Sequence, residues 1–298
     1  MDTLLILIAS PSGAVRLDQS ILDRVAAAHG LAASPRWLAP GLACEWLLRA
    51  EAPQYRALED GTRALLGEAP IDVAVIPAAG RRKSVLVADM DSTMIGQECI
   101  DELAVLAGVG DRIAEITARA MRGELEFEQA LEERVAMLAG LPEAAISQVI
   151  AERLTFMPGG HALVRTMRAH GATTALISGG FTAFTAHVAS QIGFDLHRAN
   201  TLLVEDGRLS GRVALPILGR NAKLEGLLEL CAARGVTPRD AITVGDGAND
   251  IPMLEAAGLG VALHAKPKTR DAASVRIDHG DLTALLYLQG YTIDEFTD

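Results

Sequence analysis

The chain has 298 residues, half of them hydrophobic, and a formal net charge of −11 at pH 7. This length allows one large domain or two smaller ones, each with a hydrophobic core. The acidic net charge argues against a general nucleic-acid surface, which needs clustered Lys and Arg. It also means that an anionic substrate must meet local positive charge or a metal.

The N-terminus and the cysteines point to a cytoplasmic protein. The first apolar stretch lacks a basic region before it, is too short to span a bilayer and ends at Pro11 and Gly13. No later segment is long and apolar enough to be transmembrane. Three widely spaced cysteines without a Cys-x-x-Cys pair are typical of a reducing compartment.

Residues 1–80 have the pattern of a separate small domain. The expected strands and helices follow a βαββαβ order, with strands at 3–8, 33–38, 43–48 and 71–76 and helices at 17–28 and 55–66. This order is that of a ferredoxin-like α+β domain. The basic run Arg81-Arg82-Lys83 closes an expected linker at 78–83 and is interpreted as a solvated hinge.

The stretch that follows carries two carboxylates at the end of an apolar strand. Residues 85–88 are an unbroken apolar run, typical of a buried parallel strand, and Asp89 and Asp91 come directly after it. Open α/β sheets bind ligands at this end of their strands. Two carboxylates in such a place repel unless a cation joins them, which favours Mg²⁺. The competing interpretation is an ordinary turn, in which Asp is common.

Residues 97–153 contain no convincing strand. Helices are expected at 100–107, 111–121, 127–138 and 143–152, separated by glycines and Pro142. A helical block inserted directly after a catalytic strand can serve as a lid that excludes water and contacts the substrate.

The α/β pattern resumes near residue 157. After an expected strand at 173–177, Ser178, Gly179 and Gly180 lead into a helix, an arrangement in which N–H groups, a hydroxyl and a helix dipole can hold a phosphate. Ser178 is interpreted as a phosphate ligand because no His base is placed to make it a nucleophile.

The last third of the chain adds one more acidic loop. An Asp-Gly turn at 206–207 predicts a hairpin, and Lys223 opens a helix. The strand expected at 241–244 runs into Gly-Asp-Gly-Ala-Asn-Asp at 245–250, and short strands are expected at 260–263 and 275–277. By itself this acidic loop could be a helix cap.

These pieces occur together in one order. Asp-x-Asp-Ser-Thr at 89–93, Ser178-Gly179-Gly180, Lys223 and the loop 245–250 resemble the motifs of the haloacid dehalogenase-like phosphatases, from about Val85 to the C-terminus. The resemblance implies an α/β fold: a Rossmann-like parallel sheet in residues 81–298 with a helical cap at about 97–153. Residues 1–80 resemble the ACT domains that precede some members of this family.

The resemblance also implies a role for each residue of the motifs. Asp89 would be the nucleophile and Asp91 the proton donor and acceptor, although the residues alone would permit either assignment. Mg²⁺ would lie between Asp89, the backbone carbonyl of Asp91 and Asp246, with Asp250 in support. The residues implied to bind phosphate are Ser178, Gly179, Gly180, Lys223 and Asn249.

Four cap residues narrow the resemblance to phosphoserine phosphatases, which make serine in the last step of its biosynthesis. Glu98, Met121, Phe127 and Arg134 match positions that this family uses for the amino acid end of O-phosphoserine. Each has an ordinary alternative as a surface charge or a core residue.

Other functions stay open at this point. One is another small phosphate ester as substrate, or phosphate transfer to homoserine. Another is an amino acid sensor centred on the N-terminal domain. An amino acid effector at that domain and a homodimer are further partner hypotheses, and neither nucleic acid nor membrane is expected as a partner.

Overall fold

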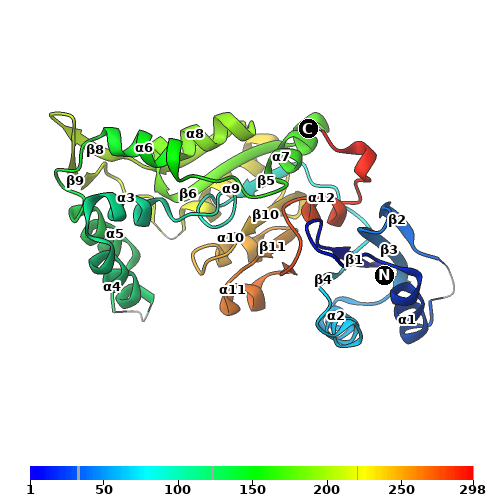
Figure 1. Ribbon diagram of the computed structural model, residues 1–298. Helices are drawn as coiled ribbons and strands as arrows, with labels where there is room; N and C mark the ends of the chain where they lie inside the picture. Colours follow the sequence, from blue (N-terminus) through cyan, green and yellow to red (C-terminus); the bar gives the residue numbers. More distant parts are fainter. Residues whose placement is uncertain (32–33, 122–123, 220, 298) are drawn as a thin grey trace. The chain divides into compact units, whose positions relative to one another are not determined.

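A computed structural model describes residues 1–31, 34–121, 124–219 and 221–297 (Figure 1). The chain divides into two compact units. One comprises residues 1–86, 158–173 and 230–298, and the other comprises residues 87–157 and 174–229.

The N-terminal part of the first unit is an antiparallel sheet with two helices. Its strands are β1 (Asp2–Ala9), β2 (Arg36–Ala39), β3 (Ala43–Arg49) and β4 (Ile71–Pro77). Among the described residues they are ordered β2-β3-β1-β4. Helices α1 (Gln19–His29) and α2 (Ala52–Leu66) lie on one face of this sheet (Figure 1). The predicted βαββαβ order of a small α+β domain is confirmed.

Both faces of this sheet are buried, which explains the unbroken apolar sequence of its first strand. Leu5 and Leu7 of β1 pack with Ile21 and Val25 of α1. Residues of the opposite face, including Ile6, are also buried. On that side β1 contacts α12 (Ala284–Leu288) and β4 contacts β12 (Val275–Ile277). The N-terminal sheet therefore packs against C-terminal elements of the same unit.

The larger sheet is the predicted Rossmann-like core. Its described strands are ordered β12-β11-β10-β5-β6-β7. The bounds of those not yet given are β5 (Val85–Ala88), β6 (Thr173–Phe181), β7 (Leu196–Asn200), β10 (Ala241–Gly245) and β11 (Leu259–Leu263). The pairs β10–β11, β11–β12 and β6–β7 are parallel. Strand β7 was not predicted as part of this sheet, because most of its residues are polar or exposed, as is common at a sheet edge.

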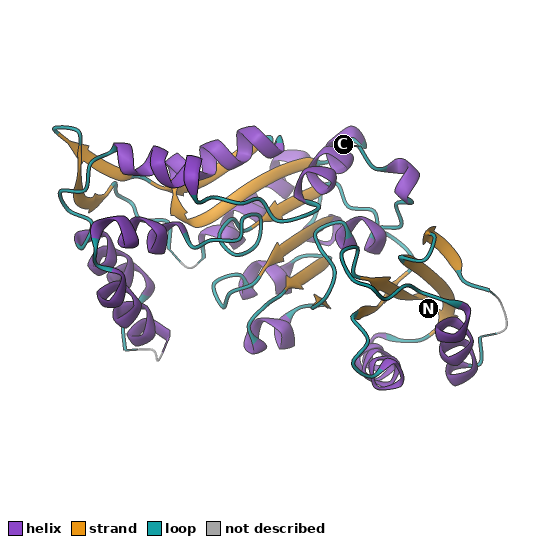
Figure 2. Cartoon of the chain, in the orientation of Figure 1, coloured by secondary structure: helices purple, strands orange, loops and turns teal. Residues whose placement is uncertain are grey.

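The segment between β5 and β6 is mainly helical (Figure 2). It contains α3 (Cys99–Ala107), α4 (Gly110–Met121), α5 (Phe127–Ala136), α6 (Ala144–Glu152) and α7 (Gly160–Ala169). The first four match the helices expected for an inserted cap. The two ends of the cap meet. The Gly96 N–H donates to the Thr155 carbonyl at 3.0 Å, and the Met157 N–H donates to the Met94 carbonyl at 3.0 Å. The chain thus leaves and re-enters the core at one place.

The remaining helices and strands follow β6. They are α8 (Thr182–Ile192), the hairpin β8 (Leu202–Glu205) and β9 (Arg208–Val213), α9 (Ala222–Arg234), α10 (Ile251–Ala256) and α11 (Pro267–Ala272). The predicted turn is present, with Asp206 and Gly207 at φ of 50° and 72°. Residues 281–298, for which the sequence predicts a helix and an acidic tail, contain α12 and a 3₁₀ turn at Ile293–Glu295.

The interpretation of the basic run at 81–83 as a solvated hinge was wrong. Arg81 forms an ion pair with Glu45, and its side chain is largely buried. Arg82 pairs with Glu295. The Lys83 ammonium donates to the Arg239 carbonyl at 2.6 Å. Because these partners are distant in the chain, the sequence alone could not reveal them. The boundary between domains at 1–80 and 81–298 stays a prediction.

Within the part of the chain that the structure describes, no helix has both the length and the apolar character needed to cross a bilayer.

Candidate active site

The centre of the candidate site is a buried ion pair. Asp89, the residue after β5, and Lys223, in the first turn of α9, are 5% and 4% exposed. The Lys223 Nζ lies 2.7 Å from Asp89 Oδ1, which also accepts the Met90 N–H at 2.7 Å. A charge buried this deeply is costly unless a partner compensates it. The structure therefore joins two residues that the sequence predicted to act together.

The turn after Asp89 is tight and sets the direction of the next carboxylate. The Met90 carbonyl accepts N–H groups from Thr93, Met94 and Ile95, and Ser92 has a positive φ of 54°. A non-glycine residue in this conformation is held there by its surroundings. The chain reverses immediately after the strand, so Asp89 and Asp91 belong to one compact loop.

Asp91 has a different environment from Asp89. Its Oδ1 accepts the Cys99 N–H at 3.2 Å. A Cβ atom on Gly180 would lie 2.8 Å from its Oδ2, so glycine leaves room for this carboxylate. Burial, with a smaller contribution from the charge of Glu98, raises the pKa of Asp91 to about 7. A carboxyl group with this pKa can both donate and accept a proton near neutral pH.

The predicted phosphate loop lies at the carboxyl end of β6. Ser178 is buried, and its Oγ accepts the Gly180 N–H at 2.8 Å. The Asn200 amide donates to the Gly179 carbonyl at 3.0 Å and accepts the Leu218 N–H at 2.8 Å. Asn200 therefore fixes the loop from β7. Asn200 was not predicted as a site residue, although the segment 200–202 resembles an Asn-containing segment of the same family.

The second acidic loop follows β10. Asp250 is fully buried and its Oδ2 accepts the Gly247 N–H at 2.9 Å. A Cβ atom on Gly245 would approach the Asp250 carboxyl carbon to 2.3 Å, so this position needs glycine. Asn249 is half-buried beside it. Asp246 is buried as well.

Three carboxylates could hold a metal ion. One oxygen from each of Asp89, Asp246 and Asp250 lies within 4.8 Å of the others, and all three residues are buried. Several hard oxygen donors in a small space suit Mg²⁺. Asp250 therefore belongs with the candidate ligands, whereas the sequence analysis gave it only a supporting place. Asp91 was expected to offer the metal its backbone carbonyl, so its carboxylate need not belong to this group of described residues.

A sequence profile of the haloacid dehalogenase-like hydrolases matches residues 86–255. This match covers more than half of the chain. The chain belongs to the haloacid dehalogenase-like hydrolase family. The resemblance predicted from the motifs is thereby confirmed.

Two curated relatives in this family are named phosphoserine phosphatase. The protein from Streptomyces coelicolor is 46% identical over 228 residues, which cover 76% of this chain and 55% of the relative. The protein from Albidiferax ferrireducens is 47% identical over 205 residues, covering 67% of this chain and 86% of the relative. This hydrolase thus spans about half the length of the first relative and most of the second.

Two solved structures extend the comparison. A probable phosphoserine phosphatase from Vibrio cholerae, in unliganded form, has a TM-score of 0.78 and 32% identity, covering 98% of this chain and 88% of that one. A phosphoserine phosphatase described as a phospho-aspartyl intermediate analogue has a TM-score of 0.64 and 38% identity, covering 69% of this chain and 98% of the other. The first likeness includes the N-terminal domain of the hydrolase.

The cap residues of this hydrolase are less constrained than its loops. Glu98 is exposed and accepts a hydrogen bond from the Ser92 hydroxyl at 2.9 Å. The Arg134 Nε donates to the Ala130 carbonyl at 3.1 Å. Burial lowers the pKa of Arg134, and the negative charges of Asp101, Glu98 and Asp91 oppose that shift. Arg134 and Glu98 are therefore electrostatic neighbours of the proposed proton donor.

Phe127 approaches the phosphate loop, as a residue that packs on a substrate should. A Cβ atom on Gly179 would lie 3.0 Å from the Phe127 ring. Met121 ends α4, and its side chain lies outside the described part of the chain.

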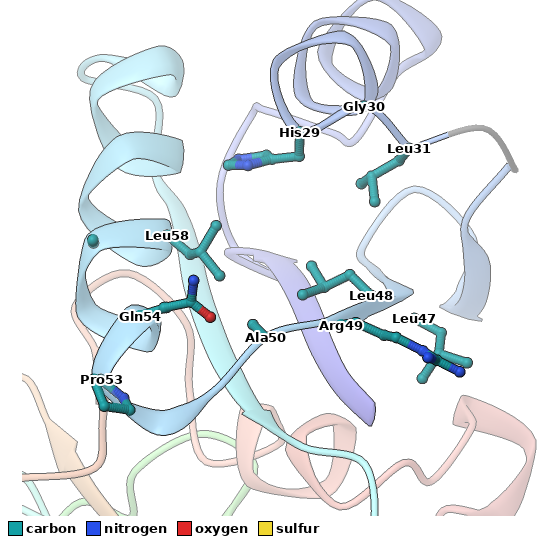
Figure 3. Close-up of a pocket in the computed structure, with 11 residues that line it drawn as sticks. His29, Gly30, Leu31, Leu47, Leu48, Arg49, Ala50, Pro53, Gln54 and Leu58 are labelled. Atoms are coloured by element: carbon teal, nitrogen blue, oxygen red, sulfur yellow. The ribbon is translucent and has the colours of Figure 1, made fainter. Parts of the chain in front are cut away.

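A separate hollow of about 740 Å³ lies in the N-terminal domain, between α1, β3 and α2 (Figure 3). Leu31, Leu48 and Leu58 form much of its lining. Arg49 also lines it, and its side chain is 92% exposed. None of the residues predicted for catalysis lines this hollow.

Proposed function

We propose that this hydrolase is a Mg²⁺-dependent phosphoserine phosphatase that converts O-phospho-L-serine and water into L-serine and phosphate through a phosphoaspartyl enzyme. The observation that carries the proposal is the buried Asp89–Lys223 pair of 2.7 Å at the end of β5. The names of the two relatives and of the structural neighbours support the substrate.

In the first half-reaction an Asp89 carboxylate oxygen attacks phosphorus. The bond between phosphorus and the serine oxygen breaks, and Asp91 gives its proton to that oxygen. The pKa of about 7 at Asp91 supports this role, because a useful fraction of the group is protonated at neutral pH. Lys223, Ser178 and the Gly179 N–H hold the phosphoryl oxygens and offset their charge.

In the second half-reaction water hydrolyses the phosphoaspartyl enzyme. Asp91, now ionised, takes a proton from a water molecule, and the resulting nucleophile displaces the Asp89 oxygen from phosphorus. The products are inorganic phosphate and the free Asp89 carboxylate. The enclosed position of Asp91, beside Cys99 and Gly180, supports its use in both steps.

Mg²⁺ is the cofactor of this proposal. Asp89, Asp246 and Asp250 would hold it, directly or through water, together with the backbone carbonyl of Asp91. When bound, the ion neutralises negative charge on the transferring phosphoryl group. The buried oxygen donors support a hard divalent cation over a soft one.

The cap would bind the amino acid end of the substrate. We assign the substrate ammonium to Glu98 and its carboxylate to Arg134, whose planar fork suits a carboxylate. Phe127 and Met121 would pack against the body of the substrate. The proximity of Glu98 and Arg134 to Asp91, expressed in their mutual charge effects, supports this assignment.

The experiment that tests the proposal measures phosphate release from phosphoserine, phosphothreonine, phosphoglycolate, a sugar phosphate and p-nitrophenyl phosphate, with Mg²⁺ and with EDTA. We expect phosphoserine to give the highest kcat/KM, and we expect EDTA to abolish turnover reversibly. A sugar phosphate preferred over phosphoserine would reject the substrate. Labelled phosphate transferred to homoserine in preference to water would support a phosphotransferase instead.

Two finer parts of the proposal, the effector site and the homodimer, need their own measurements. The hollow between α1 and α2 is our candidate site for an amino acid effector. Serine inhibition that is lost in Leu58→Arg, without a change in uninhibited rate, would support it. Light scattering tests the homodimer. Cys44, Cys99 and Cys231 are buried and free, which supports a reducing, cytoplasmic location.

A further inference from the structure

A buried carboxylate of the N-terminal domain holds a loop of the catalytic core. Asp72 of β4 is 2% exposed. Its oxygens accept N–H groups from Asp278 at 2.7 Å, His279 at 3.2 Å and Gly280 at 2.6 Å. These residues follow β12, more than 200 positions away in the chain. Several N–H donors aimed at one carboxylate are what a buried anion needs to offset lost hydration.

The fit between Asp72 and this loop is close. A Cβ atom on Gly280 would lie 3.0 Å from Asp72 Oδ2, so glycine permits the short bond. The neighbouring contacts between the domain and the same segment are weaker. Asp60 of α2, for instance, is 3.9 Å from Arg276 and 58% exposed. Asp72 is therefore the main polar anchor between β4 and residues 278–280.

The anchored loop holds a second segment in turn. The Gly280 carbonyl accepts a hydrogen bond from the His264 ring at 2.8 Å, since a carbonyl can only accept. The His264 N–H donates to the Ile277 carbonyl at 2.8 Å. His264 has a φ of 45°, a left-handed conformation that non-glycine residues seldom adopt. The two hydrogen bonds explain how this conformation is kept.

The second segment reaches a proposed metal ligand. Lys266, two residues after His264, donates its N–H to the Asp246 carbonyl at 3.1 Å, and its Nζ is 3.9 Å from Asp246 Oδ2. The contacts therefore run without a gap from Asp72 through Gly280 and His264 to Lys266 and Asp246. All five residues belong to the first compact unit.

We propose that Asp72 and His264 are positioning residues that fix the Asp246 loop for metal binding. The N-terminal domain thereby contributes to the metal site without touching substrate. The inference rests on the proposed function only in assigning Asp246 to Mg²⁺. Outer partners of metal ligands typically change affinity about 10–100-fold. Because Asp72 acts through Gly280, His264 and Lys266, we expect a smaller effect, roughly 5-fold.

The test uses the full chain and two pairs of variants. Asp72→Asn replaces one acceptor oxygen with an NH₂ group, which cannot accept a hydrogen bond from the loop N–H groups. Its control is Glu45→Gln, which alters an equally buried carboxylate of the same domain whose partners are Arg36 and Arg81. His264→Ala removes the ring donor. Its control, His264→Gln, keeps an N–H at similar reach and has a similar backbone penalty.

Two readouts are independent of turnover: calorimetric titration with Mg²⁺ alone, and amide hydrogen exchange of residues 245–250 in metal-free protein. We expect Asp72→Asn and His264→Ala to weaken Mg²⁺ binding about 5-fold and to speed exchange in this loop. Glu45→Gln and His264→Gln should stay near wild type in both.

Wild-type values in Asp72→Asn would overturn the inference, and so would equal losses in Glu45→Gln, which would indicate general destabilisation. If the wild-type protein bound no Mg²⁺, the proposed function would fail by itself. The exchange rates of the 245–250 loop would still decide whether Asp72 and His264 position it.

Discussion

The loops at the strand ends and the cap differ in how firmly their functional residues are held. Asp89, Lys223 and Ser178 are nearly inaccessible, and each has a partner in the protein at 2.7 or 2.8 Å. Glu98 is exposed and Arg134 is only half-buried. The loop groups are thus set before substrate arrives, which favours electrostatic stabilisation of a transition state. The cap groups are free to respond to the substrate. Chemistry and substrate choice should therefore respond to different substitutions.

The largest effect should come from Asp89→Asn. The amide keeps the size of the side chain but cannot form the phosphoenzyme, so turnover of every ester should fall by more than about 10⁴-fold. Activity assays and circular dichroism would test this. A folded variant with substantial activity would show that Asp89 is not the nucleophile. The assignment of the chemistry to the strand-end loops would then be wrong.

Lys223→Met should rank second. It leaves Asp89 buried without its cation and removes a phosphate ligand. We expect a loss of about 10²–10³-fold in kcat. The loss should be equal for phosphoserine and p-nitrophenyl phosphate, because both carry the same phosphoryl group. A loss confined to phosphoserine would mean that Lys223 recognises the amino acid part of the substrate and does not take part in phosphoryl transfer.

Arg134→Ala should separate the two regions. Losing one partner of a desolvated charge pair costs about 2–5 kcal/mol, so kcat/KM for phosphoserine should fall by at least about 30-fold. Hydrolysis of p-nitrophenyl phosphate, which has no carboxylate, should barely change. Equal losses on both esters would show that Arg134 supports the fold or the chemistry.

Glu98→Gln is the companion of that variant. It should weaken the preference for phosphoserine over phosphoglycolate, which lacks the ammonium group, while leaving the rate with phosphoglycolate nearly unchanged. Measuring both esters side by side provides the control. An unaltered preference for phosphoserine over phosphoglycolate would show that Glu98 does not bind the substrate ammonium.

The smallest effect concerns stability and the pKa of Asp91. The folded protein holds this proton up to pH of about 7, whereas the unfolded chain releases it near the usual value of 3.8. The favourable contribution of Asp91 to the free energy of unfolding is therefore lost as pH rises from about 4 through 7. In EDTA, Asp91→Asn should gain stability relative to wild type over this range. Thermal melts at several pH values test it, and a pH-independent difference would contradict the raised pKa.

The sequence was most informative where chemistry follows an apolar strand. Asp89, Ser178 and Asp246 each come directly after such a run, so the position of each at the carboxyl end of a strand could be predicted. Cap helices followed from periodicity and glycine breaks. The pairing of residues far apart could not be predicted in the same way, because it depends on which surfaces meet.

Asn200, Asp72 and Arg81 illustrate that limit. Each looks like an ordinary polar residue in its local sequence. Their partners are the Gly179 carbonyl, the 278–280 backbone and Glu45, none of which is nearby in the chain. Strand β7 was missed for a related reason: an edge strand needs few apolar residues, so its pattern is weak.

The most direct test of the account is to identify the residue that carries phosphate during turnover. Wild-type protein would be mixed with ³²P-labelled phosphoserine and Mg²⁺, quenched in acid within milliseconds and digested, and the labelled peptide would be sequenced. We expect acid-stable label on Asp89, assigned by fragmenting the labelled peptide because that peptide also contains Asp91, and none in Asp89→Asn. Label on Asp91 or Ser178, or phosphate release with no labelled enzyme at any quench time, would contradict the central claim.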